Sequence, residues 1–258
     1  MELQGRVTVI TGGASGIGAA CARAFSMEGA KVVIADVNVE GASAVADDIG
    51  AIAIACDVGK EEDVGALVEM TEAEVGKIDV FFSNAAVATG GDPISTPVDT
   101  WQQQWQINVM GHVYAVRAVL PAMLTRGEGY LVHTASMAGI LTSQGNVTYA
   151  TTKHAVVGLA EWLSITYHDQ GIRTSLLAPL GVNTPMLGGG NSPFARAAAG
   201  PVKEPEDVAD MVVRAIHDER FLILTDEIAQ TWMERKTNDL ERWLHGMRRL
   251  QRKMDEVV

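Results

Sequence analysis

The chain has 258 residues, 47% of them hydrophobic, and this length and composition fit one large α/β domain that spans residues 1–258. Its formal net charge of −12 argues against nucleic-acid binding, because phosphate contacts need a basic surface. The N-terminus lacks the charge pattern of a signal peptide and no apolar run approaches the roughly 18 residues that span a bilayer, so we expect a cytoplasmic protein with no membrane partner. The two cysteines and six histidines show no metal-ligand spacing, so we expect no metal site.

Seven short apolar runs recur along the chain, and most are continuous rather than alternating. Continuous apolar runs are typical of strands that are buried on both faces of a parallel sheet. The runs are Val7–Thr11, Lys31–Asp36, Ala51–Asp57, Ile78–Ser83, Tyr130–Ser136, Arg173–Ala178 and Phe221–Leu224. Helix-length segments lie between them: Gly16–Glu28, Glu40–Asp48, Lys60–Gly76, Thr100–Arg126, Thr148–Gln170 and Glu204–Glu219. This alternation predicts a Rossmann-type α/β fold, a doubly wound parallel sheet of about seven strands with helices on both faces.

The C-terminal segment, from about 226 to 258, is predicted to be a helical extension. Apolar residues form a helical stripe at Leu240, Trp243, Leu244, Met247, Leu250 and Met254. Asn238, with Glu241 three residues on, resembles a capping box at the start of this helix. Two positions remain open for it: packed on its own subunit, or reaching over a substrate pocket, its own or a neighbour's.

A glycine-rich loop joins the first strand to the first helix. It reads Thr11-Gly12-Gly13-Ala14-Ser15-Gly16-Ile17-Gly18. A strand, a glycine loop and a helix in this order place a dinucleotide pyrophosphate against backbone N–H groups at a helix N-terminus. The second strand ends at Asp36, where an acid accepts hydrogen bonds from the adenosine ribose and repels a 2′-phosphate. No Lys or Arg follows Asp36 directly, so the sequence favours NAD over NADP.

Tyr149 and Lys153 lie four residues apart in a predicted helix, so their side chains share one face. An ammonium beside a phenol favours the phenolate and lowers its pKa from about 10 towards neutrality. Such a tyrosine could exchange a proton with an alcohol or a ketone near pH 7. Taken alone, the spacing also fits a surface Tyr and a surface Lys on an ordinary helix.

With these residues in place, the sequence resembles the short-chain dehydrogenase/reductase family in its form of about 250 residues. The spacing Gly12-x-x-x-Gly16-x-Gly18 is similar to the loop of that family. Further similar motifs run in order to about residue 185: Cys56-Asp57-Val58, Ser83-Asn84-Ala85-Ala86, Asn108, Ser136 thirteen residues before Tyr149, and Pro179 through Thr184. Three positions depart from the pattern. Ser83 and Ala86 replace an Asn and a Gly, and Leu180 replaces a Gly that borders the nicotinamide in the family.

The resemblance implies roles for individual residues. Tyr149 would be the general acid/base, Lys153 would lower its pKa and bind the nicotinamide ribose, and Ser136 would hold the substrate oxygen. Asn108 would fix a water that relays protons from Lys153 to solvent. The implied cofactor-binding residues are Gly12, Ser15, Gly16, Ile17, Gly18, Asp36, Asp57, Val58, Asn84, Ala85, Tyr149, Lys153, Pro179, Val182 and Thr184.

The resemblance implies an NAD(H)-dependent oxidoreductase that interconverts a secondary alcohol and a ketone. Leu141, Leu180, Met186 and Leu187 indicate an apolar substrate pocket, and Gly188-Gly189-Gly190 indicates a mobile lid. Two alternatives stay open: a dihydrodiol or other CH–OH dehydrogenase of the same family, and a non-catalytic dinucleotide-binding protein. The family's habit, with the nearly all-round apolar segment Thr148–Gln170, implies a homotetramer or a homodimer.

Overall fold

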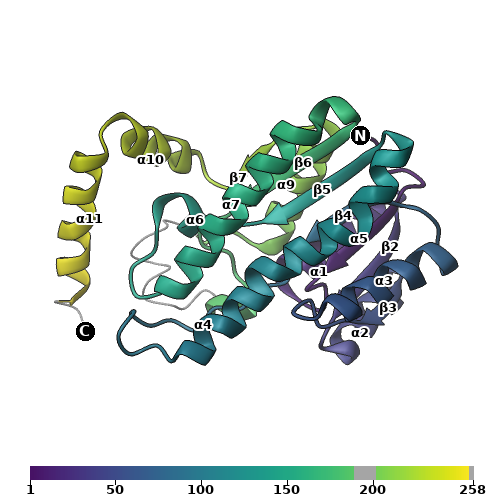
Figure 1. The fold of residues 1–258 in the computed structure, drawn as a ribbon, viewed down its shortest axis with the longest axis horizontal. Coiled ribbons are helices and arrows are strands. Elements are labelled where there is room, and N and C mark those ends of the chain that lie inside the picture. Colours follow the sequence, from purple (N-terminus) through teal and green to yellow (C-terminus); the bar gives the residue numbers. More distant parts are fainter. Residues whose placement is uncertain (189–201, 256–258) are drawn as a thin grey trace.

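The computed structural model describes residues 1–188 and 202–255. Its centre is one seven-stranded sheet in the order β3-β2-β1-β4-β5-β6-β7, and every neighbouring pair is parallel. The order runs outward in both directions from β1 and β4, which is the doubly wound topology. The predicted fold class is confirmed (Figure 1).

The strands follow the apolar runs closely. They are β1 Val7–Thr11, β2 Lys31–Asp36, β3 Ile52–Ala55, β4 Ile78–Ser83, β5 Gly129–Thr134, β6 Ile172–Ala178 and β7 Leu222–Leu224. Two strands end earlier than expected, because Cys56 and Asp57 leave the sheet after β3, and Ala135 and Ser136 leave it after β5. The polar residues that were placed at the ends of these strands therefore lie on loops above the sheet.

Helices cover both faces of the sheet. The α-helices of the described residues are α1 Gly16–Met27, α2 Val39–Ile49, α3 Glu61–Glu74, α4 Val98–Trp105, α5 Gly111–Arg126, α6 Ala138–Leu141, α7 Val147–Tyr167, α9 Pro205–His217, α10 Glu227–Asn238 and α11 Leu240–Asp255. Buried residues of α1, α2 and α9 form one core with the sheet, and buried residues of α3, α5 and α7 form the core on the opposite face. Two further helices consist of a single turn. One follows α7 at His168–Gln170, and the other lies at Pro185–Leu187.

The segment predicted as the helix Thr100–Arg126 contains a π-helical stretch. Gln106–Met110 is wound as a π-helix between α4 and α5. Such insertions are rare and often mark functional sites. The whole of Val98–Arg126 is long and apolar enough to cross a membrane by length and composition, which corrects the expectation that no segment is. In this fold, however, buried residues of α5 pack against the sheet, as in the core helix of an α/β protein.

The C-terminal extension is helical, as predicted, but it is divided into two helices. In Figure 1, α10 leads away from the α/β body and α11 turns back along its outer side. The start of α11 is capped by Asp239 rather than Asn238, because the Arg242 N–H donates to Asp239 Oδ1 at 2.9 Å. The capping box expected at Asn238 is therefore wrong by one residue.

Candidate active site

A cavity of about 1100 Å³ opens at the carboxyl ends of the strands. This is the edge at which parallel α/β sheets bind their ligands. Of the residues expected to bind a cofactor, Gly18 does not line this cavity. The others do: Gly12, Ser15, Gly16, Ile17, Asp36, Asp57, Val58, Asn84, Ala85, Tyr149, Lys153, Pro179, Val182 and Thr184.

The glycine loop between β1 and α1 is packed against the loop that follows β4. Gly12 has φ +67°, and a Cβ there would lie 2.8 Å from the Cα of Ala85. A Cβ on Gly18 would lie 2.2 Å from the carbonyl oxygen of Gly12, so Gly18 allows the helix to approach the loop without itself reaching the cavity. The Asn84 side chain fixes this contact, because its Nδ2 donates to the carbonyls of Thr11 and Gly12 at 3.1 and 3.3 Å. The result is a cradle of exposed backbone that fits a dinucleotide pyrophosphate.

The far end of the cavity carries two carboxylates. Asp36, at the end of β2, accepts hydrogen bonds from the backbone N–H of Ala14 at 3.0 Å and of Asn38 at 2.9 Å. Asp57, after β3, accepts one from the Gly59 N–H at 3.0 Å. Among the described residues that line this end, none is Lys or Arg. A negative site of this kind suits a ribose with free hydroxyl groups better than one with a 2′-phosphate.

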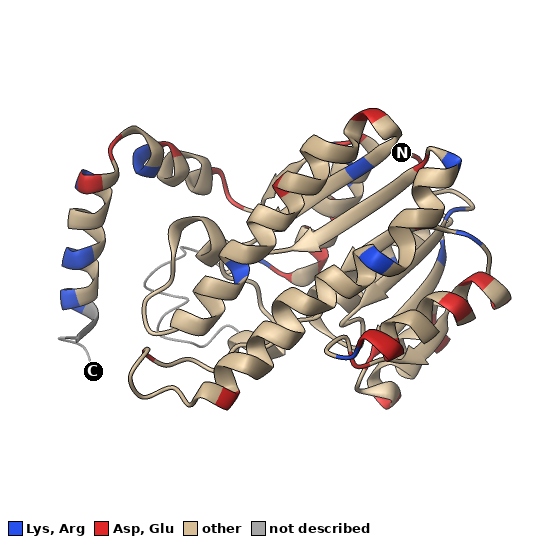
Figure 2. Cartoon of the chain, viewed as in Figure 1, with Lys and Arg blue, Asp and Glu red and all other residues tan. Residues whose placement is uncertain are grey.

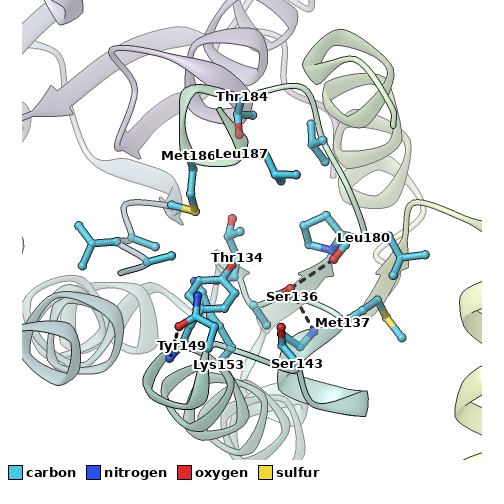
Figure 3. A pocket seen from close by; sticks show the side chains of 18 of the residues that line it. Thr134, Ser136, Met137, Ser143, Tyr149, Lys153, Leu180, Thr184, Met186 and Leu187 are labelled. Carbon is cyan, nitrogen blue, oxygen red and sulfur yellow. Dashed lines mark hydrogen bonds between the residues drawn. The ribbon is translucent and has the colours of Figure 1, made fainter. Parts of the chain in front are cut away.

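Ser136, Tyr149 and Lys153 converge on the middle of the cavity (Figure 3). Ser136 lies just past β5, where its Oγ accepts from the Ala138 N–H at 3.1 Å and donates to the Pro179 carbonyl at 3.4 Å. The other two side chains come from the first turns of α7. Lys153 is fully buried, and its Nζ lies 5.6 Å from the centroid of the Tyr149 ring. The predicted one-turn spacing thus places the Tyr149 phenol and the Lys153 ammonium close to each other.

Burial dominates the electrostatics of this group. Burial raises the pKa of the Tyr149 phenol, and its hydrogen bond with Ser136 opposes this rise only in part. Burial also lowers the pKa of the Lys153 ammonium to about 7. Lys153 Nζ donates to the Thr134 carbonyl at 2.7 Å, which is a neutral partner. Loss of water therefore disfavours the charged forms of both groups, and the expectation that Lys153 lowers the pKa of Tyr149 stays a prediction for the enzyme with its cofactor bound.

Asn108 is not among the residues that line the cavity. It lies in the π-helical stretch and is fully buried. Its Oδ1 accepts from the Val87 N–H and its Nδ2 donates to the Val87 carbonyl, both at 2.8 Å. The same Nδ2 lies 3.2 Å from Thr152 Oγ1, to which it donates. The amide thus ties the loop after β4 to α7 beside Lys153, and the water relay expected at Asn108 stays a prediction.

The remaining part of the cavity is apolar. Met186 and Leu187 face Tyr149 across the opening in Figure 3, and Met137 and Leu180 lie on the side of Ser136. The lid expected at Gly188–Gly190 falls partly outside the described residues. The C-terminal extension supplies further lining residues that sequence reasoning left out or left undecided: Trp232, Arg235, Trp243, Gly246, Met247 and Leu250. The extension therefore reaches over the pocket of its own chain.

Leu180, one of the departures from the family pattern, belongs to the apolar cluster that holds this extension. The cluster joins Met137, Leu141 and Ala178 to Ala229 on α10, and Leu180, Trp232 and Trp243 pack against it. A glycine at position 180 would remove side-chain contact from this cluster. The other two departures lie elsewhere, since Ser83 is buried opposite His133 in the β4–β5 ladder and Ala86 lines the cavity.

Comparisons with known proteins give a consistent result. Residues 6–193 match the family model described as short chain dehydrogenase. A 1-deoxy-11-beta-hydroxypentalenate dehydrogenase of Streptomyces exfoliatus is 35% identical over 254 residues, which cover 95% of this chain and 91% of that protein. A 2,5-dichloro-2,5-cyclohexadiene-1,4-diol dehydrogenase of Sphingobium indicum is 40% identical over 190 residues, 72% of this chain and 76% of that protein. The crystal structure of a short chain dehydrogenase/reductase from Burkholderia phymatum in complex with NAD superimposes with a TM-score of 0.86 at 31% identity, and the match covers 93% of this chain and 96% of that one.

Proposed function

Because this chain belongs to the short chain dehydrogenase family, we propose that it interconverts a secondary alcohol and a ketone with NAD(H) as the hydride carrier. The family assigns the chain to the oxidoreductases that act on CH–OH groups. The observation that supports the proposal best is the convergence of Ser136, Tyr149 and Lys153 on a cavity that continues to the glycine loop. A chain that only bound a dinucleotide would have no need of this group.

Tyr149 is proposed as the general acid/base. In the oxidation of an alcohol, its phenolate oxygen takes the hydroxyl proton of the substrate, and in the reverse reaction its phenol returns it. Because burial raises the pKa of Tyr149, the phenolate needs a nearby positive charge. Lys153 in its charged form and the nicotinamide ring of bound NAD would both supply one. Bound NAD would also provide the acceptor for the hydride of the carbinol carbon.

Ser136 and Asn108 are proposed to act on either side of this tyrosine. The Ser136 hydroxyl would hold the substrate oxygen by a hydrogen bond that strengthens as charge develops there. The side-chain amide of Asn108 is engaged by Val87 and Thr152, so we assign it to the positioning of α7 and the loop after β4. Its loss would then act through the placement of Lys153.

NAD is proposed over NADP because of Asp36. Its carboxylate lines the nucleotide end of the cavity and is fixed by two backbone N–H groups. Val37, the next residue, is 70% exposed and apolar, and Asn38 caps α2, so neither offers a cation to a 2′-phosphate. The complex of the Burkholderia phymatum protein with NAD supports the same choice.

The substrate is proposed to be fairly hydrophobic, because Met137, Leu141, Leu180, Met186 and Leu187 line its part of the cavity. A cyclic diol is the second candidate. The Sphingobium indicum relative, named as a cyclohexadienediol dehydrogenase, favours this alternative. A non-catalytic dinucleotide-binding role is the weakest candidate, since Tyr149, Ser136 and Lys153 are all present.

The chain is proposed to form one catalytic domain that assembles as a homotetramer or a homodimer in the cytoplasm. The outer face of α7 supports the assembly, because Trp162 is 56% exposed and Ile165 is 83% exposed. Isolated large apolar side chains are common on surfaces, but two on one helix face favour contact with another copy. Size measurement in solution tests this part of the proposal.

The test of the function is the substitution Tyr149→Phe, which removes one hydroxyl and keeps the ring. We expect NAD reduction with a panel of secondary alcohols to fall by at least about 100-fold, the lower range for a general acid/base. The affinity for NADH should stay within a few-fold. Tyr167→Phe, on the same helix but outside the cavity lining, is the matched control and should retain activity. Unchanged turnover of the Tyr149→Phe enzyme would refute the assignment.

A further inference from the structure

The charges along the cavity are separated by sign. Of the described residues that line it, four are charged: Asp36 and Asp57 at the nucleotide end, Lys153 in the middle, and Arg235 on α10. Lys153 is buried and donates to a backbone carbonyl. Arg235 is exposed and stands among the apolar residues of the substrate end. The substrate end thus has a cation at its rim and no carboxylate within the described lining.

The helix that carries Arg235 is held firmly to the body of the protein. Ala229 is fully buried beneath α10, and Trp232 and Met233 pack on the cluster that contains Leu180. Lys236 adds a polar anchor, because its Nζ donates to the Ile140 carbonyl at the end of α6. In Figure 2 the blue segment of α10 lies near the end of that helix, before the chain turns into α11. The guanidinium therefore projects from a fixed helix rather than from a loose tail.

Arg235 has no ion pair with any carboxylate among the described residues. The nearest acids along the chain are engaged elsewhere. Glu234 accepts from Gln230 Nε2 at 2.9 Å, and Asp239 caps α11. The segment 189–201, whose structure is not described, contains Arg196 and no Asp or Glu. No acid from that segment can therefore neutralise Arg235.

We propose that Arg235 binds a carboxylate carried by the substrate, at a distance from the carbinol carbon that reacts. This inference rests on the proposed function and narrows its substrate class to apolar, preferably cyclic, hydroxy or keto acids. A guanidinium suits this role because its planar donors match both oxygens of a carboxylate. Trp232, one turn before Arg235 on α10, and Leu180 line the same cavity and would contact the apolar part of such a substrate.

The test measures binding to the enzyme that is saturated with NADH, by calorimetric titration. The two probes are adamantane-1-carboxylate and adamantane-1-carboxamide, which share an apolar cage and differ in charge. We expect wild type to prefer the carboxylate, and Arg235→Gln to reduce the ratio of the two affinities by about tenfold, within the range for a charge-assisted hydrogen bond. Arg235→Lys should give an intermediate ratio, since a single ammonium cannot bind both oxygens in one plane.

Arg242→Gln is the matched control, because Arg242 is on α11 and outside the cavity lining, and it should leave the ratio unchanged. Three results would overturn the inference: no preference for the carboxylate in wild type, an equal loss of affinity for both probes in Arg235→Gln, or the same change of ratio in the Arg242→Gln control. Oxidation of uncharged secondary alcohols and of cyclic hydroxy acids by wild type with NAD is measured in parallel. Oxidation of neither set would refute the proposed function, whereas oxidation of either set without a carboxylate preference in the titration would refute the role of Arg235 alone.

Discussion

His112, near the start of α5, and His133, on β5, form a buried pair whose Nδ1 atoms lie 3.0 Å apart. Each is only 1% exposed. When both rings are neutral, one Nδ1 donates to the other, and the two rings then have different tautomers. The Thr134 carbonyl that accepts Lys153 Nζ belongs to the residue after His133. The pair therefore lies close to Lys153, whose charge contributes to the low pKa of His112.

Acid should destabilise the protein through this pair. Burial, reinforced by the charges of His133 and Lys153, holds the pKa of His112 well below its ordinary value, and burial lowers the pKa of His133 to about 4. In the unfolded chain these two histidines take up protons near pH 6.5, whereas in the folded chain they stay neutral at that pH. The free energy of unfolding therefore falls as the pH drops from about 6.5 to about 4, by about 3 kcal/mol for His133 alone.

Chemical denaturation at pH 7.5, 6 and 5 measures this fall. The double variant His112→Leu/His133→Met should have a shallower dependence than wild type, and His168→Gln, which removes an exposed histidine, should keep the wild-type slope. Equal slopes in the double variant and in wild type would show that other groups cause the effect. If the double variant does not fold, proton uptake on unfolding of wild type at pH 5 gives the same quantity, and an uptake well below two protons at that pH contradicts the prediction.

Gly18→Ala should damage the glycine loop even though Gly18 does not reach the cavity. The added Cβ would lie 2.2 Å from the Gly12 carbonyl oxygen and 2.8 Å from Asn84 Nδ2. The helix must move away, at a cost of about 1–3 kcal/mol in stability, and NADH affinity should fall at least tenfold. Thermal unfolding and NADH fluorescence titration check both effects. Gly65→Ala is the control, because nothing lies within 4 Å of its Cβ, and it should be neutral or stabilising.

The sequence was sufficient for the fold because its strands are continuous apolar runs. Val7–Thr11 and Ile78–Ser83 are both strands with the predicted bounds, and nearly every residue in them is buried. The α10 helix was not predicted separately, because its only strongly apolar residues, Ile228, Trp232 and Met233, are few among polar neighbours. Besides its chain neighbours β7 and α11, it contacts α6 and the loop after β6, which are far away in the chain, and such distant contacts cannot be read from the local spacing of apolar residues.

The one-turn separation of Tyr149 and Lys153 was predictable from the sequence, whereas the burial of their side chains was not. An i, i+4 spacing places Tyr149 and Lys153 together, and that depends on helical geometry alone. Their pKa values depend on burial, which is decided by β5, β6 and the loops that close over α7. The position of Asn108 shows the same limit. The π-helical stretch that turns its amide towards Val87 and Thr152 has no sequence signature that could have been used.

Asp36→Asn should shift the enzyme from NAD towards NADP. The two oxygens of Asp36 accept separately from the Ala14 and Asn38 N–H groups, so the single oxygen of an asparagine keeps one of these hydrogen bonds, and the substitution removes the charge that repels a 2′-phosphate. We expect the ratio of kcat/KM for NAD to that for NADP to fall at least tenfold, about 1.4 kcal/mol. Asp47→Asn, an exposed carboxylate on α2, should leave the ratio unchanged and is the control. A wild-type enzyme that preferred NADP from the outset would contradict the assignment of Asp36.

Removal of α11, residues 239–258, should enlarge the substrate end of the cavity and leave cofactor binding intact. Trp243, Met247 and Leu250 line that end, whereas α10 keeps its own anchors at Ala229 and Lys236. We expect the KM for bulky apolar substrates to rise at least tenfold while the KM for NAD changes less than twofold. Steady-state kinetics are measured with one large and one small secondary alcohol. A loss of substrate contact raises the KM for the large alcohol alone, whereas general damage to the fold would raise the KM values for both alcohols.

A point substitution tests the same surface without shortening the chain. Met247→Ala removes a side chain that lines the cavity, whereas Leu240→Ala removes one that is 51% exposed and does not. Truncation of a large apolar side chain that contacts the substrate costs about 1–3 kcal/mol of binding, which is roughly 10- to 200-fold. Met247→Ala should therefore raise the KM for the bulky substrate and Leu240→Ala should not. Equal effects of the two substitutions on both substrates, together with lowered melting temperatures, would mean that α11 serves only to stabilise the protein.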